Sequence, residues 1–392
     1  MTADRRPIRV LRVISRLNIG GPAIHVALLS RPTSSDRIES RLVTGLENPG
    51  EGTMLEFVRS QGVEPVIIPE LVADSFIGPR DLVALWKLVR VIRAFRPDLV
   101  ETHMAKAGFL GRIAGALTGV PVRIHTFHGH VLEGYYSPIK NTVYRRVERG
   151  LARLTTRLIA VSDRVKLDLI EFGVAPPGKI DVIPLGLELS PFLNCGALRG
   201  SFKRELGLPE SALLVGIVSR IFAVKNHALF VDAAARVTKE IPEARFVVVG
   251  DGALRADTEK RARRLGLDGR VIFTGWRRDL PAIYADMAAL VISSNNEGTP
   301  FSAIEAMAAS VPVVGTRVGG MPDLIREGTT GILVPPRDAD AMSAALISLL
   351  KDADRRHRMG DAARDDVETR FNLGRMLSET HALYEACLRE TE

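Results

Sequence analysis

Short runs of β-branched and apolar residues alternate with helical patterns along almost the whole chain, and this alternation limits the possible folds more than any other feature. Such a pattern is typical of βαβ units, in which the strands run parallel and helices cover the sheet. The expected strands are 8–14, 41–44, 65–68, 98–102, 122–127, 157–161 and 180–183 in the first half, and 213–219, 245–249, 271–274, 290–293 and 311–316 in the second. The pattern predicts an α/β protein with two Rossmann-like, doubly wound sheets.

The length of the chain and one segment without periodicity indicate two domains. A chain of 392 residues exceeds what one ordinary core accommodates. Residues 187–205 lack periodicity and contain Pro191 and Gly196, so we expect the hinge there. The predicted organisation is a first domain over 1–190, a second over 200–371, and an amphipathic C-terminal helix within 372–392.

One predicted helix is strongly amphipathic. Residues 79–95 repeat apolar side chains at a spacing of three and four. The expected buried stripe consists of Leu82, Leu85, Trp86, Val89 and Ile92.

Composition narrows the class of protein. Hydrophobic residues make up 46% of the chain and charged residues 25%, which is typical of a globular protein. The two cysteines, Cys195 and Cys387, do not form a disulfide framework. Arginines interrupt the apolar run of residues 1–30, and no apolar stretch reaches 18 residues. We therefore expect a cytoplasmic protein without a membrane-spanning helix.

The charge balance indicates anionic partners. A net charge of +7 suits nucleotide phosphates, acidic lipid or nucleic acid. Nucleic acid is the least favoured of these, because aromatic residues are only 5% of the chain and no known binding motif occurs.

The segment Glu297-Gly-Thr-Pro-Phe-Ser-Ala-Ile-Glu305 carries the clearest chemical pattern. A short apolar strand precedes it, and Pro300 suits the first turn of the helix that follows. The free N–H groups at that helix start favour an anion. Two carboxylates beside an anion site suit a nucleotide-sugar, which offers phosphate, ribose hydroxyls and sugar hydroxyls. An ordinary strand-loop-helix with a structural ion pair is the alternative.

This segment resembles the Glu-x7-Glu motif of family-4 retaining glycosyltransferases with the GT-B fold, in which two Rossmann-like domains face a cleft. The resemblance extends over nearly the whole chain. It implies that residues 1–190 form the acceptor-side domain, that residues 200–371 bind the nucleotide-sugar, and that the helix within 372–392 crosses back to the first domain. It implies that Glu297 contacts the donor sugar and that Glu305 binds the ribose. It also implies that the backbone of the loop between them approaches sugar and phosphate, through Gly298, Thr299, Pro300, Phe301 and Ser302.

The first strand-to-helix loop contains paired glycines. Gly20 and Gly21 let backbone approach a ligand, and Pro22 starts a helix. We expect their amides to face the donor diphosphate across the cleft; a tight turn without ligand is the alternative. His25, one turn further on, is expected to have a core or surface role; a position facing the cleft is the alternative.

Histidines gather at the ends of two expected strands. His103, His125, His128 and His130 fall within 28 residues, and Lys106 follows His103 in a His-x-x-Lys pattern. The family resemblance places His128 near the anomeric centre and gives His103 and Lys106 an acceptor-side role. A zinc site at His103, His128 and His130 is disfavoured, because no carboxylate or cysteine stands at ligand spacing. We expect neither a metal nor a cofactor.

Two cations follow the first strand of the second half. Arg220 emerges where the strand ends, and Lys225 opens the next helix. Together they can neutralise a diphosphate leaving group. The pair matches the family's Arg-x4-Lys element; solvated loop charges are the alternative.

Glycine-rich turns complete the expected donor site. By resemblance, Gly250 lies near the nucleotide, as does Gly252, whereas Gly275, Trp276 and Arg277 line the base. The Gly319-Gly320 turn is expected to be structural. The segment 184–188, Pro-Leu-Gly-Leu-Glu, departs from the Asn-Gly-Ile/Val-Asp of many members, so we assign it no function.

A basic segment follows the histidines. Lys140, Arg145, Arg146, Arg149, Arg153 and Arg157 are opposed only by Glu148, and Val143, Val147, Leu151 and Leu154 form a second stripe. Such a helix can lie on an anionic membrane surface. A solvated outer face of a packed helix is the alternative.

These patterns predict a retaining, metal-independent glycosyltransferase that moves a sugar from a nucleotide-sugar, preferably a UDP-sugar, to a polysaccharide or lipid-linked acceptor. It would be cytoplasmic or peripheral on the inner face of the cell membrane. Another GT-B enzyme such as a nucleotide-sugar epimerase, or a noncatalytic sugar- or membrane-binding protein, remains an alternative. An NAD-dependent dehydrogenase is disfavoured, because no G-x-G-x-x-G follows a strand.

Overall fold

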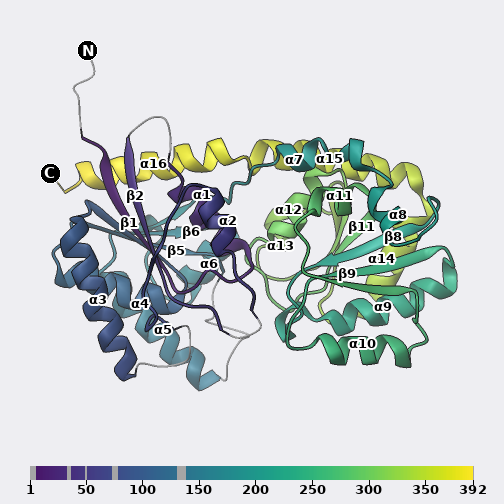
Figure 1. The fold of residues 1–392 in the computed structure, drawn as a ribbon, viewed down its shortest axis with the longest axis horizontal. Helices are drawn as coiled ribbons and strands as arrows, with labels where there is room; N and C mark the ends of the chain where they lie inside the picture. Colours follow the sequence, from purple (N-terminus) through teal and green to yellow (C-terminus); the bar gives the residue numbers. More distant parts are fainter. Residues whose placement is uncertain (1–5, 33–36, 49–50, 73–77, 130–137, 392) are drawn as a thin grey trace, which may run out of the picture. The chain divides into compact units, whose positions relative to one another are not determined.

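The computed structural model describes residues 6–32, 37–48, 51–72, 78–129 and 138–391, which form two compact α/β units. The first unit contains residues 1–186 and 373–392, and the second contains residues 187–372 (Figure 1).

The first unit is built on a parallel sheet of seven strands. Its strands are β1 (Ile8–Ile14), β2 (Ile38–Thr44), β3 (Val66–Ile67), β4 (Leu99–His103), β5 (Val122–Phe127), β6 (Arg157–Ala160) and β7 (Ile180–Val182), and they lie in the order β3-β2-β1-β4-β5-β6-β7. Its helices are α1 (Gly21–Ser30), α2 (Leu55–Ser60), α3 (Pro79–Phe95), α4 (Ala105–Leu117), α5 (Pro138–Arg153), α6 (Asp163–Glu171) and α16 (Leu373–Arg389), with a 3₁₀ turn η1 (Pro177–Lys179).

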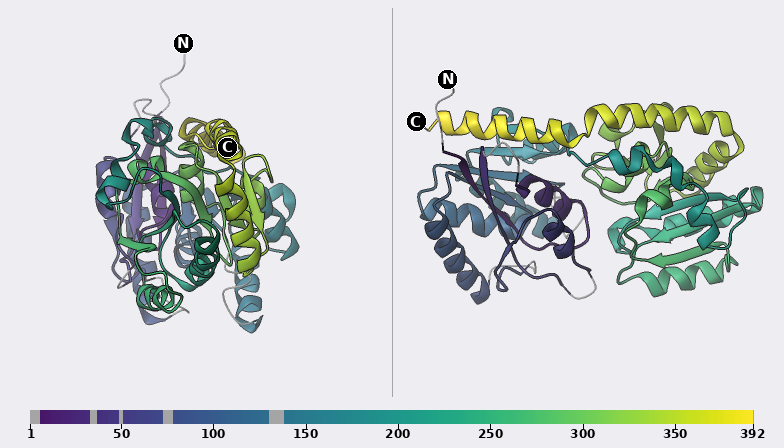
Figure 2. Two further views of the ribbon diagram at one scale, coloured as in Figure 1. Left: turned by 90° about the vertical axis from the view of Figure 1, so that its right-hand side faces the viewer. Right: turned by 45° about the horizontal axis from the view of Figure 1, so that its top comes forward.

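Helices cover both faces of this sheet because its strands are apolar on both sides (Figure 2). Leu11 and Val13 of β1 pack against α3 and α4. Val10 of the same strand faces the other way, against α1 and α16. The C-terminal helix therefore contributes to the core of the first unit.

The second unit repeats this plan with six parallel strands. Its strands are β8 (Leu213–Val218), β9 (Ala244–Val249), β10 (Val271–Gly275), β11 (Met287–Ile292), β12 (Val313–Thr316) and β13 (Gly331–Val334), in the order β10-β9-β8-β11-β12-β13. Its helices are α7 (Ser190–Leu193), α8 (Ser201–Glu205), α9 (His227–Glu240), α10 (Arg255–Arg264), α11 (Leu280–Ala285), α12 (Phe301–Ala308), α13 (Met321–Leu324), α14 (Ala339–Lys351) and α15 (Ala353–Arg370), with 3₁₀ turns η2 (Cys195–Leu198) and η3 (Ala223–Lys225). Helices α9 and α14 cover one face of the sheet.

The structure differs from the sequence prediction at the expected hinge. Residues 190–205 are not a free linker: they form α7, η2 and α8 inside the second unit. Phe192 packs edge-on against Tyr284, and the carboxylate of Asp286 accepts hydrogen bonds from the Gly200 and Lys203 N–H groups. These elements are too short for a periodic pattern, so the sequence could not reveal them. Strand β13 was missed for the same reason.

The predicted apolar stripe of α3 is wrong in part. The buried side chains include Ala84, Leu88, Ile92 and Phe95, whereas Leu82 and Trp86 are 66% and 55% exposed. Two overlapping apolar stripes run along this helix, and contact with the sheet and α4 selects the one that contains the smaller Ala84.

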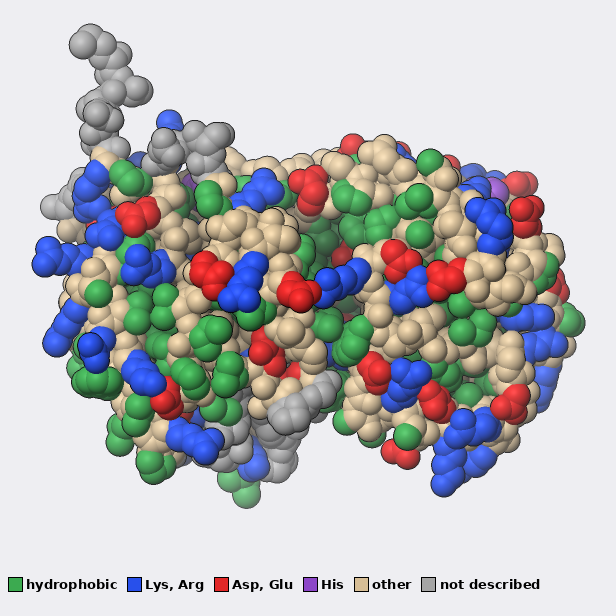
Figure 3. Space-filling model, viewed as in Figure 1, with side chains coloured by type: hydrophobic (Ala, Val, Ile, Leu, Met, Phe, Trp, Pro, Cys, Tyr) green, Lys and Arg blue, Asp and Glu red, His purple; other side chains and the backbone are tan. Residues whose placement is uncertain are grey.

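Charge on the surface is mixed. On the face drawn in Figure 3, Lys and Arg side chains are interspersed with Asp and Glu, and a group of basic side chains lies over α10. On this face the basic side chains do not form one continuous patch.

Candidate active site

The strand order of the second unit reverses between β8 and β11, which lie side by side. In open parallel sheets, ligands bind at such a reversal, outside the carboxyl ends of the strands. The loop after β8 carries Arg220 and Lys225, and the loop after β11 carries Glu297. Residues about 70 positions apart in the chain are thus brought to one sheet edge.

Lys225 and Glu297 form a direct ion pair at this edge. The Lys225 Nζ atom lies 2.6 Å from Glu297 Oε1, and the Ser294 hydroxyl donates to the same oxygen. The lysine side chain is 22% exposed and the glutamate side chain 8% exposed. A positive and a negative group, both partly open to solvent, can therefore meet a ligand that offers phosphate and hydroxyl groups.

Backbone contacts hold the two loops together. The Asn295 N–H donates to Val224 O at 2.7 Å, and the Ser293 hydroxyl donates to Lys225 O at 2.8 Å. Asn226, in the left-handed conformation, caps α9 through its side chain and so fixes the end of the Lys225 turn. Ordering the loops in advance lowers the entropy lost when a ligand binds.

The Gly319-Gly320 turn packs against the backbone carbonyl of Glu297, a contact that the sequence did not predict. The Gly320 N–H donates to Glu297 O at 3.1 Å. A Cβ atom on Gly319, whose φ is +49°, would lie 1.7 Å from the same carbonyl oxygen. Only glycine fits this contact, so the turn after β12 fixes the path of the Glu297 loop.

Arg220 lies at the end of β8 and is partly buried. Its guanidinium carbon lies 5.2 Å from the centre of the Phe222 ring. A Cβ atom on Gly250 would lie 2.0 Å from Ser219 O, so this glycine lets the β9 loop approach the backbone beside Arg220. The Gly250 N–H already donates to Gly275 O. Gly250 therefore shapes the loop, and its N–H is not available to a phosphate.

Glu305 lies inside α12 and is 6% exposed. The hydroxyl of buried Tyr284 donates to Glu305 Oε2 at 2.9 Å. Burial raises the pKa of Glu305 to about 7, although the hydrogen bond from Tyr284 opposes this shift. A carboxylate that is only partly ionised near neutral pH would gain from ribose hydroxyl donors.

The start of α12 has the geometry expected for an anion site. Pro300 precedes the helix in an extended conformation, and Thr299, Pro300 and Phe301 are buried, while Gly298 and Ser302 are partly exposed. The first N–H groups of a helix have no partner within the helix, so they favour a negative ligand.

The Gly275–Arg277 turn follows β10. The Trp276 side chain is 38% exposed and so could face a ligand. The Arg277 guanidinium pairs with both Glu205 and Asp279, and these hydrogen bonds raise its pKa. These pairs hold the turn in place, and the contact of Arg277 with the base stays a prediction.

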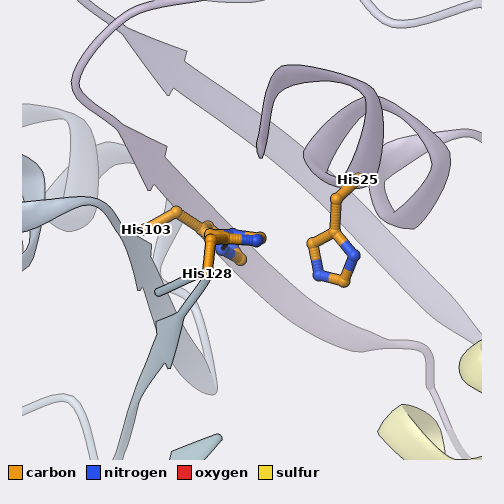
Figure 4. A group of neighbouring side chains, drawn as sticks. All are labelled: His25, His103 and His128. Carbon is orange, nitrogen blue, oxygen red and sulfur yellow. Dashed lines mark hydrogen bonds between the residues drawn. The ribbon is translucent and has the colours of Figure 1, made fainter. Parts of the chain in front are cut away.

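The first unit has its own strand-order reversal, between β1 and β4. Gly20 and Gly21 lie between β1 and the body of α1, and His25 follows on that helix. His103 ends β4, and His128 follows β5. The three imidazoles meet: His103 Nδ1 lies 3.1 Å from His128 Nε2, and the His25 ring centre lies 4.8 Å from that of His128 (Figure 4).

Burial controls the charge of this group. Burial first, then the charge of His103, lowers the pKa of His25 to about 3. Burial, with repulsion from His25 and His103, also holds the pKa of His128 well below its usual range. Both side chains are therefore neutral at physiological pH, and each can accept a hydrogen bond. His25 is buried, as a core role requires, but the sequence did not predict its contact with His128.

A buried network of Glu101, Arg12 and Tyr384 lies next to His103. Glu101 Oε1 lies 3.6 Å from His103 Nε2, Arg12 pairs with Glu101 at 3.1 Å, and the Tyr384 hydroxyl of α16 donates to Glu101. Burial would raise the pKa of Glu101, but attraction to His103 and Arg12 and the hydrogen bond from Tyr384 hold it well below its usual range. The network stays ionised, which keeps His103 in place.

The predicted acceptor-side pair is largely buried in this unit. His103 is completely buried, and Lys106 forms an ion pair with Asp81 of α3 at 2.9 Å. His130, the third member of the zinc hypothesis, lies outside the described residues.

Comparison with known proteins agrees with this architecture. Residues 199–366 match the family model described as Glycosyl transferases group 1, and residues 20–186 match that described as Glycosyl transferase 4-like domain. The chain is 31% identical over 311 residues to UDP-Gal:alpha-D-GlcNAc-diphosphoundecaprenol alpha-1,3-galactosyltransferase of Escherichia coli, a match that covers 78% of this chain and 79% of that protein. This chain belongs to glycosyltransferase family 4.

Further relatives and structures extend the comparison. This glycosyltransferase is 31% identical over 315 residues to D-inositol 3-phosphate glycosyltransferase of Corynebacterium kroppenstedtii, covering 75% of this chain and 68% of that protein. The crystal structure of Anabaena Alr3699/HepE in complex with UDP-glucose superposes with a TM-score of 0.82 at 21% identity, over 97% of this chain and 100% of that one. The GT-B fold predicted from the sequence is confirmed.

No helix of this glycosyltransferase, within the residues that the structure describes, is long and apolar enough to span a membrane.

Proposed function

We propose that this enzyme is a retaining, metal-independent glycosyltransferase that uses a UDP-sugar and extends a polysaccharide or lipid-linked acceptor. The Lys225–Glu297 ion pair carries this proposal, because it places a cation and a hydrogen-bond acceptor at the strand-order reversal, close to the start of α12. Two names among the relatives support the substrate class: the E. coli relative is named for UDP-Gal and a diphosphoundecaprenol-linked acceptor, and the Anabaena structure holds UDP-glucose.

In the proposed donor complex, Arg220 and Lys225 neutralise the charge that develops on the departing diphosphate. The backbone of Gly298, Thr299, Pro300, Phe301 and Ser302 approaches the sugar and phosphate, and Glu305 receives the ribose hydroxyls. Glu297 accepts from the sugar hydroxyls on the side away from Lys225. Diphosphate binding would then provide Lys225 with a second anionic partner.

The residues of the first unit would act on the sugar side. The family resemblance assigns His128 to the anomeric centre and the Gly20-Gly21 amides to the donor. A neutral His128 suits this task, because it can accept a hydrogen bond from a sugar hydroxyl. Gly275 and Trp276 remain the residues proposed for the base.

The same groups support the proposal of retention and metal independence. If a donor phosphate oxygen takes the acceptor's proton on the face that the leaving group occupies, no protein nucleophile is needed. Two side-chain cations can supply the charge that a divalent ion supplies on other folds. The two Asp-x-Asp pairs of the sequence begin with Asp338 and Asp352, and the side chains of these two residues cap the starts of α14 and α15.

We expect sugar transfer to persist in excess EDTA. The first step is a thermal-shift screen against UDP-, GDP- and TDP-sugars, in which a ligand at 100 times its dissociation constant stabilises the protein by about 2.7 kcal/mol. The stabilising donor is then incubated with lipid-linked glycan acceptors and EDTA, and the product's anomeric configuration is read by NMR. Inversion of configuration, or full loss of transfer that Mg²⁺ or Mn²⁺ restores, would contradict the proposed mechanism. Epimerised donor without transfer would identify an epimerase.

Helix α5 is the proposed membrane contact. Its Ile139, Val143 and Val147 are 79%, 43% and 36% exposed, at successive turns of one face. The predicted apolar stripe is thus turned outward over most of its length, and of its four members only Leu151 is buried. Exposed apolar side chains with flanking cations suit an anionic lipid surface.

The acidic residue of α5 does not weaken that surface. Glu148 is buried and pairs with Arg112 of α4 at 2.8 Å. Lys140 and Arg146 are exposed beside the apolar stripe. The outer face of α5 therefore presents cations and apolar groups together, as expected for an enzyme that meets a lipid-linked acceptor.

Reversing charge on α5 is expected to weaken binding to anionic vesicles. The double variant Lys140→Glu, Arg146→Glu removes two attractive charges worth about 1 kcal/mol each, so affinity for phosphatidylglycerol vesicles should fall roughly 30-fold or more. Co-sedimentation measures this, and Leu82→Asp, at an exposed apolar position of α3, is the matched control. Equal binding of the double variant and the unmodified protein, or binding that does not depend on anionic lipid, would exclude this contact.

A further inference from the structure

Three histidines from separate parts of the chain form one cluster in the first unit. His25 comes from α1, His103 from the end of β4 and His128 from the loop after β5 (Figure 4). One ring nitrogen from each lies within 4.8 Å of those of the other two. The strand-order reversal between β1 and β4 brings these segments together.

The distances suit a transition-metal ion. Zn²⁺ binds imidazole nitrogen at about 2.0–2.1 Å, so that ligand nitrogens of one ion lie within about 4 Å of one another. Nitrogens that already lie within 4.8 Å need only small ring rotations to reach that arrangement. Imidazole is a preferred ligand of Zn²⁺, Ni²⁺ and Cu²⁺.

Histidine nitrogens without hydrogen-bond partners also support a metal site. Among the described residues, His25 Nδ1, His103 Nε2 and His128 Nδ1 are buried nitrogens without a hydrogen-bond partner. A buried polar atom left unpaired is destabilising by about 1–3 kcal/mol. His103 Nε2 lies 3.6 Å from Glu101 Oε1, so the nitrogens that remain to be explained are His25 Nδ1 and His128 Nδ1, and packing alone does not explain them.

Glu101 could serve as the carboxylate that usually hydrogen-bonds to a metal-bound histidine. Its Oε1 atom lies 3.6 Å from His103 Nε2, while His103 Nδ1 faces His128. A carboxylate behind a metal-bound imidazole orients the ring and strengthens it as a ligand. Arg12, Thr126 and Tyr384 in turn hold Glu101 through the contacts that they make to its two oxygens.

We propose that His25, His103 and His128 bind a single divalent transition-metal ion of the Zn²⁺ class, with Glu101 as the supporting carboxylate. The sequence analysis disfavoured zinc for two reasons. It took His130 as the third ligand, and no carboxylate stands at ligand spacing in the sequence. The fold supplies His25 as a third ligand, and Glu101 becomes adjacent to His103. The ion is an inhibitor and not a cofactor, since it would occupy the imidazole of His128; this last statement rests on the proposed function.

The binding test uses tag-free, metal-stripped protein. Zn²⁺ is titrated in competition with a chromophoric chelator, and Co²⁺ serves as a spectroscopic probe for nitrogen ligands. We expect one equivalent to bind, and His25→Leu, which keeps the side-chain volume but removes one ligand, to weaken binding by about 100-fold or more. His381→Gln, a partly buried histidine on α16, is the matched control and should bind as the unmodified protein does.

Unchanged Zn²⁺ affinity in His25→Leu, or a Co²⁺ complex without the absorption bands of nitrogen ligands, would overturn the site. If His25→Leu does not fold, His25→Gln and the Co²⁺ spectrum of the unmodified protein decide instead. Binding is read without any activity assay, so the absence of sugar transfer would refute the proposed function and leave the metal site standing.

The inhibition test is separate. Stoichiometric Zn²⁺ should abolish transfer in the unmodified enzyme, and EDTA should restore it. At the same Zn²⁺ concentration, His25→Leu should lose a much smaller fraction of its own metal-free rate. Zn²⁺ bound at the three histidines without any loss of transfer would overturn the inhibitory role.

Discussion

Replacing Arg220 or Lys225 by alanine is expected to lower turnover at least 100-fold. Each side chain would stabilise negative charge on the departing diphosphate, and loss of one such group is equivalent to about 3 kcal/mol of transition-state stabilisation. The structure places Lys225 on Glu297 at 2.6 Å, so Lys225→Ala also leaves a partly buried carboxylate without its cation. Steady-state rates with saturating UDP-sugar measure the effect.

Matched variants separate charge from folding. Lys239→Ala, at an exposed position of α9, should retain normal turnover. Lys225→Arg should recover part of the rate, because it keeps the positive charge but changes its geometry. Near-normal turnover in Arg220→Ala or Lys225→Ala, with an unchanged melting temperature, would remove that residue from the mechanism.

Glu305→Gln is expected to stabilise the second unit at pH 8 and to weaken UDP binding at the same time. In the folded protein the pKa of Glu305 is about 7, above its ordinary value of 4.5. The folded state therefore holds the proton more tightly than the unfolded state, and the free energy of unfolding falls as the pH rises from about 4.5 to about 7. Glutamine does not ionise and can still accept from Tyr284, so the variant escapes a loss of about 3 kcal/mol.

Chemical denaturation of both proteins at pH 5 and pH 8 measures this difference. The advantage of Glu305→Gln should be small at pH 5 and close to its full size at pH 8, whereas Glu243→Gln, at an exposed position, should change little at either. Calorimetry with UDP at pH 8 should show at least 10-fold weaker binding to Glu305→Gln, because a hydrogen bond to a charged group contributes about 1.5–3 kcal/mol. A stability difference independent of pH would show that Glu305 is not the buried acid described here.

Chemical patterns that are local in the chain could be predicted well. The alternation of strands and helices indicated two parallel sheets, and the comparisons confirm the GT-B fold. Arg220, Lys225 and Glu297 each follow a short apolar strand, and parallel strands present their carboxyl ends at one edge. Because neighbouring residues determine strand, turn and helix start, these loops could be identified without knowing the order of the strands.

Contacts between distant segments could not be predicted in this way. Arg12 looked like an interruption of an apolar run, yet it is fully buried because Glu101 and Tyr384, the latter 372 residues away, offer it charge and hydrogen bonds. His25 joined His103 and His128 only because β1 lies beside β4.

The sequence by itself determined the longer strands and helices and the loops that carry charge, but not short elements such as α7 and β13. The tertiary structure alone decided which stripe of α3 is buried, which carboxylate Lys225 meets, and which three histidines share one site. The physical reason is that periodicity shows that a side chain must be covered, whereas its partner depends on the order in which the strands assemble.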